Sequence, residues 1–340
     1  MPNLMSQFPS SPEEQVTLAN WRTAPFSSWA FHHVREVVAS ADVSNNPDDV
    51  WQLEQAAVDF SSLKIDDKSL GEVCKETKND GLVILHKGKL AYESYDNGMD
   101  AFTPHILMSV SKSVLGLLGG ILVGKGILEP SALITDYLPE LVGTAWKDAT
   151  VQEALDMRVG IHFEEDYLTT SGPIIDYRKA TNWNPLEPGD ELSDLRSFFL
   201  TLTEREGPHS GKFHYVSPNT DLLAWVYERA SGERYADLLS DFLWKPMGAE
   251  RSAYFTVDRF GAPRAAGGVC VTTPTWLGWD NCWSKTGKEA VKKSSLSHGL
   301  KTSNSMVIQR LGNKANLRSS IQTKKCTTGL NATWFGAMNR

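Results

Sequence analysis

Apolar residues are concentrated in one stretch near the middle of the chain, residues 107–123. They would occupy nearly every side of a helix over this stretch, which predicts a helix buried on all sides. Two polar residues at its start, Ser109 and Lys112, are three positions apart and therefore share one helix face. We expect the rest of the chain to present these two side chains. The apolar positions are Val110, Val114, Leu115, Leu117, Leu118, Ile121 and Leu122.

Upstream of this helix, the pattern predicts a short antiparallel unit. Residues 81–95 contain two apolar runs separated by a Lys-Gly pair, which is typical of a β-hairpin. Residues 29–38 and 50–60 have the spacing of surface helices. His32 and His33 lie in the first of them and are expected to pack or to face solvent and not to bind a metal.

Downstream, residues 109–247 are expected to be mostly helical. Thr150 and Glu153 form a capping box that predicts a helix through Met157, and residues 192–202 have the apolar spacing of another. Between them, residues 160–191 are rich in Pro, Gly, Asn and Asp, and a segment of this length is typical of a functional loop. Three aromatic residues in it could either cover a pocket or anchor the loop to the core, namely Tyr167, Tyr177 and Trp183.

A further helix is predicted directly after Tyr215. Ser217 supplies an N-cap, Pro218 fits the first helical position, Asp221 is expected in the first turn, and Gly232 ends the helix. Tyr215 therefore lies in the loop before a rigid element, where its side chain can point into a site.

Composition and charge narrow the class of protein. The 340 residues are 41% hydrophobic and 22% charged, which is ordinary for a soluble globular protein with a substantial core. A net charge of -7 argues against general binding to nucleic acid or to an anionic membrane. No basic start followed by an apolar run indicates a secretory signal, and four cysteines without metal spacing suit a reducing cytoplasm. We therefore expect a cytoplasmic protein.

The pair Ser109 and Lys112 has the chemistry of a nucleophile with its base. A serine hydroxyl is a weak nucleophile at neutral pH, and a lysine in apolar surroundings can activate it because burial favours the neutral amine. Spacing alone is weak evidence, since Ser61 and Lys64 match it equally well in a polar segment. What distinguishes Ser109 is the second polar element at Tyr215, about a hundred residues further on.

Two other motifs are less convincing. Residues 119–125 have phosphate-loop spacing, but Gly126 stands where a Ser or Thr would hold magnesium, and the run continues a helix. We interpret Gly116, Gly120 and Gly124 instead as a stripe that lets another element approach closely. No Gly-x-Ser-x-Gly occurs, so an α/β-hydrolase is not expected.

The sequence resembles the serine β-lactamase and penicillin-binding superfamily, in its class C-like branch, near the hydrolases of 6-aminohexanoate oligomers and related esterases. The resemblance covers roughly residues 21–273. It depends on four segments, which are Met108-Ser109-Val110-Ser111-Lys112-Ser113, Glu165-Asp166-Tyr167, Tyr215-Val216-Ser217-Pro218-Asn219-Thr220-Asp221 and Gly267-Gly268-Val269.

This resemblance implies an α+β fold with a helical lobe, about residues 105–250, beside an antiparallel sheet that includes the hairpin. It implies catalysis by Ser109, Lys112 and Tyr215, with Tyr167 and Asn219 binding substrate and the Ser109 backbone N–H in an oxyanion hole. The expected reaction is hydrolysis of a small-molecule amide or ester through an acyl-enzyme. No metal or organic cofactor, nucleic acid or membrane partner is expected, and homodimer formation is left open.

The carboxyl-terminal part departs from this pattern. Residues 1–273 contain 23 Lys and Arg against 39 Asp and Glu, a charge of -16, whereas residues 274–340 contain 11 against 2, or +9. The family's third motif lies on a strand, but Lys285-Thr286-Gly287 and Ser297-His298-Gly299 come too soon after Tyr215 to fit it well. We therefore expect an incomplete sheet.

We therefore expect the chain to divide into three parts. These are a loose N-terminus at residues 1–20, a hydrolase domain at 21–273, and an aberrant basic tail at 274–340 that is disordered or read in a slipped frame. A suitable choice of codons would let the neighbouring frame encode an amphipathic helix at residues 274–287. The class-different alternative is a catalytically impaired relic, or a non-catalytic binding protein of the same fold.

Overall fold

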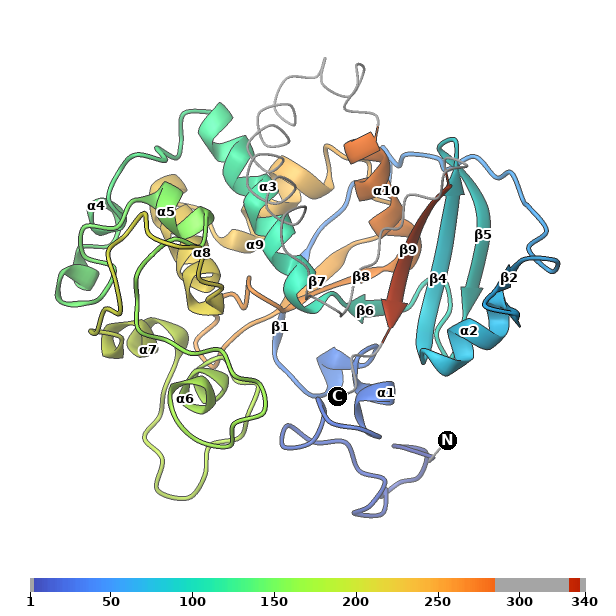
Figure 1. Ribbon diagram of the computed structural model, residues 1–340, viewed down its shortest axis with the longest axis horizontal. Helices are drawn as coiled ribbons and strands as arrows, with labels where there is room; N and C mark the ends of the chain where they lie inside the picture. Colours follow the sequence, from blue (N-terminus) through green and yellow to red (C-terminus); the bar gives the residue numbers. More distant parts are fainter. Residues whose placement is uncertain (1–2, 285–329, 337–340) are drawn as a thin grey trace.

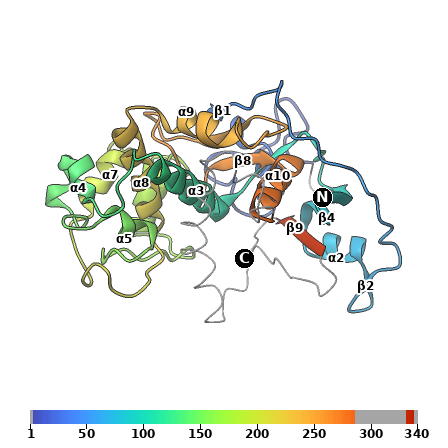
Figure 2. The ribbon, with the colours of Figure 1, turned by 90° about the horizontal axis from the view of Figure 1, so that it is seen from above.

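Helices and antiparallel strands lie side by side in the computed structural model, which describes residues 3–284 and 330–336 (Figure 1). The helices between Ser111 and Trp244 gather at one side of the molecule, and two separate sheets lie toward the other. The turn before helix α3 (Ser111–Gly124) lies between them, as the view from above also shows (Figure 2). This arrangement has the expected α+β class.

The predicted hairpin is present as β4 (Asn79–His86) and β5 (Lys89–Tyr95). Lys87 and Gly88 connect the strands with φ values of 53° and 79°, as a tight hairpin turn with two left-handed residues requires. Strand β9 (Leu330–Gly336) pairs antiparallel with the other edge of β4, giving the order β5-β4-β9. The carboxyl-terminal part therefore adds a strand to this sheet.

A second sheet leads to the start of α3. Its order is β1-β7-β8-β6, with all neighbours antiparallel, from β1 (Ser40–Val43), β7 (Ala253–Thr256), β8 (Val269–Thr272) and β6 (Pro104–Ile106). β6 ends directly before the 3₁₀ turn η2 (Met108–Val110), which contains Ser109. A further small pair is formed by β2 (Lys64–Ile65) and β3 (Lys68–Ser69).

The predicted helices of the helical lobe are present, but some begin or end a few residues away from their predicted bounds. The Thr150 and Glu153 capping box opens α5, and Gly232, with φ of 76°, ends α8. The elements are α4 (Ile134–Tyr137), η3 (Pro139–Gly143), α5 (Val151–Leu155), α6 (Pro173–Ala180), α7 (Leu195–Thr201), α8 (Ser217–Ser231), α9 (Tyr235–Leu239) and the π-helical η4 (Ser240–Trp244).

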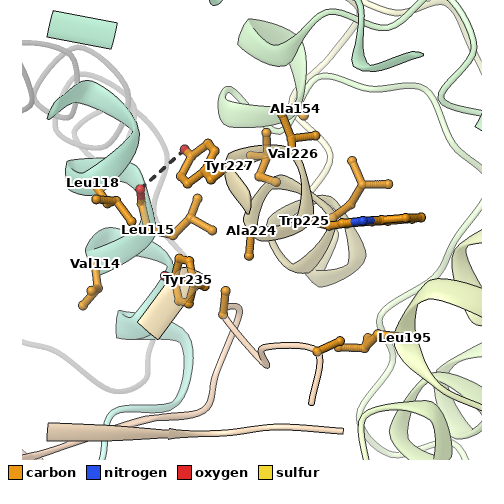
Figure 3. Close-up of a cluster of buried hydrophobic side chains, with 14 of the residues drawn as sticks. Val114, Leu115, Leu118, Ala154, Leu195, Ala224, Trp225, Val226, Tyr227 and Tyr235 are labelled. Atoms are coloured by element: carbon orange, nitrogen blue, oxygen red, sulfur yellow. Dashed lines mark hydrogen bonds between the residues drawn. The ribbon is translucent and has the colours of Figure 1, made fainter. Parts of the chain in front are cut away.

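The largest hydrophobic cluster lies where α3 packs against α8 (Figure 3). Tyr227 of α8 points its hydroxyl toward the backbone carbonyl of Leu115 at 3.5 Å. This approach is possible because residue 119 is glycine: a Cβ there would lie 2.1 Å from the Tyr227 hydroxyl. The predicted close approach to α3 thus occurs at Gly119, whereas a Cβ at Gly116 would meet nothing within 4 Å.

Two predicted surface helices are wrong. Residues 29–38 form only α1 (Ser27–Ala30) and the 3₁₀ turn η1 (Val34–Glu36). Residues 50–60 are not helical but run beside β5, where the Ala56 and Val58 N–H groups donate to the carbonyls of Leu90 and Ala91, both at 2.8 Å. The helix that precedes the hairpin is α2 (Leu70–Glu76), which opens with a capping box of Ser69 and Glu72.

Described parts of both ends of the chain pack onto the fold. Leu4 and Val16 are buried in a hydrophobic cluster with Trp21, so the segment expected to be loose is anchored by apolar contacts. A helix, α10 (Thr273–Ser284), follows β8, and its Trp276 and Leu277 are buried. Lys285-Thr286-Gly287 and Ser297-His298-Gly299, with most of the basic tail, lie outside the described residues.

None of the helices in residues 3–284 is both long and apolar enough to cross a bilayer.

Candidate active site

Ser109 is presented by a sharp turn between β6 and α3. Its side chain is exposed, so a substrate can reach the hydroxyl. The residue before it, Met108, has φ of 46°, a left-handed conformation that a residue with a Cβ adopts only at an energetic cost. Strain of this kind persists only where surrounding contacts hold it in place. It is frequent at functional sites.

Lys112 lies one turn further on, half-buried, with its amine directed at Ser109. Its Nζ is 3.2 Å from Ser109 Oγ and 2.8 Å from the carbonyl oxygen of Ala266. The same Nζ lies 4.8 Å from the centre of the Tyr215 ring. The structure therefore brings together Ser109, Lys112 and Tyr215, although Tyr215 is more than a hundred residues from Ser109.

The segment from Arg264 to Val269 packs against the turn that carries Ser109. Val269 accepts a hydrogen bond from the Leu107 N–H at 2.8 Å and donates one to Ser111 Oγ at 3.1 Å. Gly268 allows the tight bend before it, since a Cβ there would lie 2.8 Å from the Arg264 carbonyl oxygen. These contacts fix the backbone on both sides of the nucleophile.

Glu165, which sequence reasoning did not identify as a site residue, links the long loop to the start of α8. Its carboxylate accepts hydrogen bonds from the Ser217 N–H at 2.6 Å and from Ser217 Oγ at 2.5 Å. The Tyr167 hydroxyl donates to the same carboxylate. A carboxylate is favoured at a helix N-terminus because free N–H groups and the helix dipole are there.

This carboxylate also corrects the predicted cap of α8. The helix begins at Ser217 itself with Val216 as N-cap, and the Ser217 hydroxyl donates to Glu165 instead of capping its own helix. Tyr167 is 58% exposed, while partial burial and the neighbouring Glu165 raise its pKa. Tyr167 is therefore a neutral donor at neutral pH, beside Tyr215.

A buried ion pair is connected to Lys112 through Ala266. Arg264 contacts the carboxylate of Asp221, whose side chain has no exposed surface, and the Tyr177 hydroxyl donates to the same carboxylate. Burial lowers the pKa of Arg264, but Asp221 and Tyr177 outweigh it, so that the pKa is raised overall. The sequence predicted Asp221 in the first turn of α8. In the structure it lies beyond that turn.

The structure does not place Asn219 at the site surface. Its side chain is fully buried, and its Oδ1 accepts a hydrogen bond from Trp146 Nε1 at 2.8 Å. Its Nδ2 has no partner among the described residues. The predicted role of Asn219 in substrate binding stays a prediction, and in this structure its side chain lies in the core, where α8 is buried from Ser217 to Tyr227.

The competing Ser61 and Lys64 pair lacks the necessary geometry. Ser61 Oγ donates to Asp59 at 2.9 Å, and Lys64 begins strand β2, so the two do not share a helical turn. Across residues 3–284, no cluster of three or more His, Cys, Asp or Glu side chains could hold a metal ion.

Comparison with known proteins gives the family. A family profile described as Beta-lactamase matches residues 75–322, so the chain belongs to the beta-lactamase family. The match continues past Thr273, where we expected the resemblance to end. Over 267 residues, 78% of this chain and 67% of the relative, the chain is 33% identical to a 6-aminohexanoate-dimer hydrolase of Paenarthrobacter ureafaciens.

Solved structures support the fold. A protein of Bacillus anthracis assigned as a 6-aminohexanoate-dimer hydrolase superposes with a TM-score of 0.83 at 21% identity, over 97% of this chain and 93% of that one. A class C β-lactamase mutant superposes with a TM-score of 0.50 at 12% identity, over 68% and 67%.

Proposed function

We propose that this protein is a serine hydrolase that cleaves a small amide or ester through an acyl-enzyme. The observation that carries the proposal is the placement of the Lys112 amine 3.2 Å from the exposed Ser109 hydroxyl, beside the Tyr215 ring. The relative named as a 6-aminohexanoate-dimer hydrolase supports a linear amide formed from amino acids as the substrate class.

In the proposed reaction, Ser109 Oγ attacks the carbonyl carbon and its proton passes to Lys112 or Tyr215, whichever is deprotonated. The resulting tetrahedral intermediate expels the amine or alcohol, which takes up that proton as it leaves. Water then attacks the acyl-enzyme and gives a proton to the same pair. The pair passes this proton to Ser109 Oγ as the acyl bond breaks, which releases the acid and restores the serine hydroxyl. No step requires a metal or an organic cofactor.

The developing oxyanion needs hydrogen-bond donors close to Ser109. The Ser109 N–H at the start of the helix is one proposed donor, since helix N-termini favour negative charge. The second donor in this family comes from the third motif, whose candidates lie outside the described residues. Loss of one such donor costs on the order of a hundredfold to a thousandfold in rate.

A covalent probe tests the proposal directly. We expect a fluorophosphonate to label the folded wild-type chain, and p-nitrophenyl acetate to be hydrolysed, with both signals lost in Ser109→Ala. Ser61→Ala is the matched control, because it removes the serine of the other Ser-x-x-Lys spacing, and it should label like wild type. Folded wild type that is never labelled would support the non-catalytic relic or binding protein instead.

A further inference from the structure

The residue whose carbonyl binds Lys112 is itself held through its own N–H, which belongs to the preceding peptide unit. Ala266 accepts from Lys112 Nζ at 2.8 Å, and the Ala266 N–H donates to Asp221 Oδ1 at 2.6 Å. We propose that Asp221, with Arg264, is a positioning residue that holds Ala266 through its N–H, so that the Ala266 carbonyl keeps Lys112 within reach of Ser109 Oγ. This inference rests on the proposed serine hydrolase function.

The ion pair makes contacts that a pair serving only the core would not need. Arg264 satisfies one carboxylate oxygen of Asp221 together with Tyr177, and this leaves the other oxygen to bind the Ala266 N–H. Arg264 also shapes the same turn through its carbonyl, which accepts from the Gly268 N–H at 2.8 Å. A buried pair alone is weak evidence of stabilisation, because apolar replacements are often as stable.

Helix α8 would then position Lys112 by two routes. Tyr215, directly before the helix, places its ring 4.8 Å from Nζ, and Asp221, within the helix, acts through Ala266. Because Tyr215 lies only two residues before the helix that carries Asp221, the phenol and the contact that holds the amine are anchored close together. Displacement of a catalytic group by about 1 Å can cost about a hundredfold in rate, so the Ala266 contact should affect turnover.

Two double variants separate this role from that of the ion pair. Asp221→Asn with Arg264→Gln removes both charges but keeps an acceptor oxygen for the Ala266 N–H. Asp221→Leu with Arg264→Met removes the charges and the acceptor, and leaves no unpaired buried charge. Each is compared with wild type for kcat and KM on p-nitrophenyl acetate, and for its urea midpoint, so that rates are measured where every protein is folded.

We expect Asp221→Leu with Arg264→Met to lose about tenfold to a hundredfold in kcat, with KM changed by no more than about threefold. Asp221→Asn with Arg264→Gln should recover most of that loss, because it restores only the acceptor. Tyr227→Phe, a buried change on the same helix, should leave kcat unchanged.

Equal kcat losses in both double variants, or no loss in either, would overturn the positioning role while wild type remains labelled at Ser109. A wild-type chain that does not react with the fluorophosphonate would instead remove the proposed function, and this inference with it.

Discussion

At the scale of single residues, the side chains that carry chemistry were predictable where the contact is local. Ser109 and Lys112 lie together because three positions along a helix turn bring side chains to one face. Glu165 and Ser217 are 52 residues apart, and no periodicity in either segment indicates that contact. For Asn219, the motif gives the position along α8 but not how deeply the side chain is buried, and its predicted substrate contact stays a prediction.

His32 provides a prediction at this scale. Burial, with a further contribution from the neighbouring His33, lowers the pKa of His32 from 6.5 to about 4, and its Nδ1 has no hydrogen-bond partner in the described structure. The folded state therefore resists protonation, while the unfolded state binds a proton below pH 6.5. The stability contributed by the neutral ring is complete above pH 6.5 and is lost as the pH falls toward 4.

We expect this loss to reach up to about 3 kcal/mol. Urea unfolding of wild type and His32→Phe at pH 7.5 and pH 4.5 measures it, and a constant packing cost cancels because each protein is compared with itself. The variant should show the smaller drop in unfolding free energy. Parallel drops in the two proteins would contradict the assignment, and Asp80 and His105 nearby would then be the groups to examine.

At the scale of elements, the sequence predicted those whose signal is contained in the element. The hairpin β4–β5, the capping box of α5 and the glycine end of α8 are confirmed because turn and cap chemistry acts within a few residues. Residues 50–60 were wrongly predicted as a helix, since their backbone hydrogen bonds go to β5, which is remote from them in sequence. Edge pairing of this kind depends on tertiary structure and leaves no local pattern.

The contact between α3 and α8 gives a prediction at this scale. Gly119→Ala should destabilise the protein by about 1–3 kcal/mol, because the new methyl group would overlap the Tyr227 hydroxyl. Gly116→Ala on the same helix is the matched control; nothing lies within 4 Å, so it should stabilise the protein by about 0.5–1 kcal/mol.

A double-mutant cycle with Tyr227→Phe completes the measurement. Removing the hydroxyl should reduce the cost of Gly119→Ala, which would appear as a coupling energy between the two sites in urea unfolding. Additive effects of the two substitutions would mean that the hydroxyl does not determine the fit between the helices.

At the scale of the whole molecule, charge divides the chain into two unequal parts. The first 273 residues have a charge of -16 and the remaining 67 a charge of +9, although the family match continues to residue 322. Helix α10 and strand β9 show that parts of the basic segment join the fold as it stands. The slipped frame was proposed partly because the resemblance seemed to end at Thr273, and the family match past that residue removes this reason. The change in charge is the remaining support for the slipped-frame hypothesis.

The nucleotide sequence tests the slipped frame. We expect the neighbouring frame over residues 274–287 to encode Asp-Leu-Ala-Trp-Leu-Gly-Gln-Leu-Leu-Val-Glu-Asn-Gly, and to stay open to the end of the gene; codons that do not allow this reading would end the hypothesis. If the frame is present, a chain carrying the alternative tail should regain the third-motif donor. Its acylation by p-nitrophenyl acetate should then exceed that of the present chain by on the order of a hundredfold, since that is what one oxyanion donor contributes. Equal rates for the two chains would mean that the present tail already supplies that donor, or that the reaction does not need it.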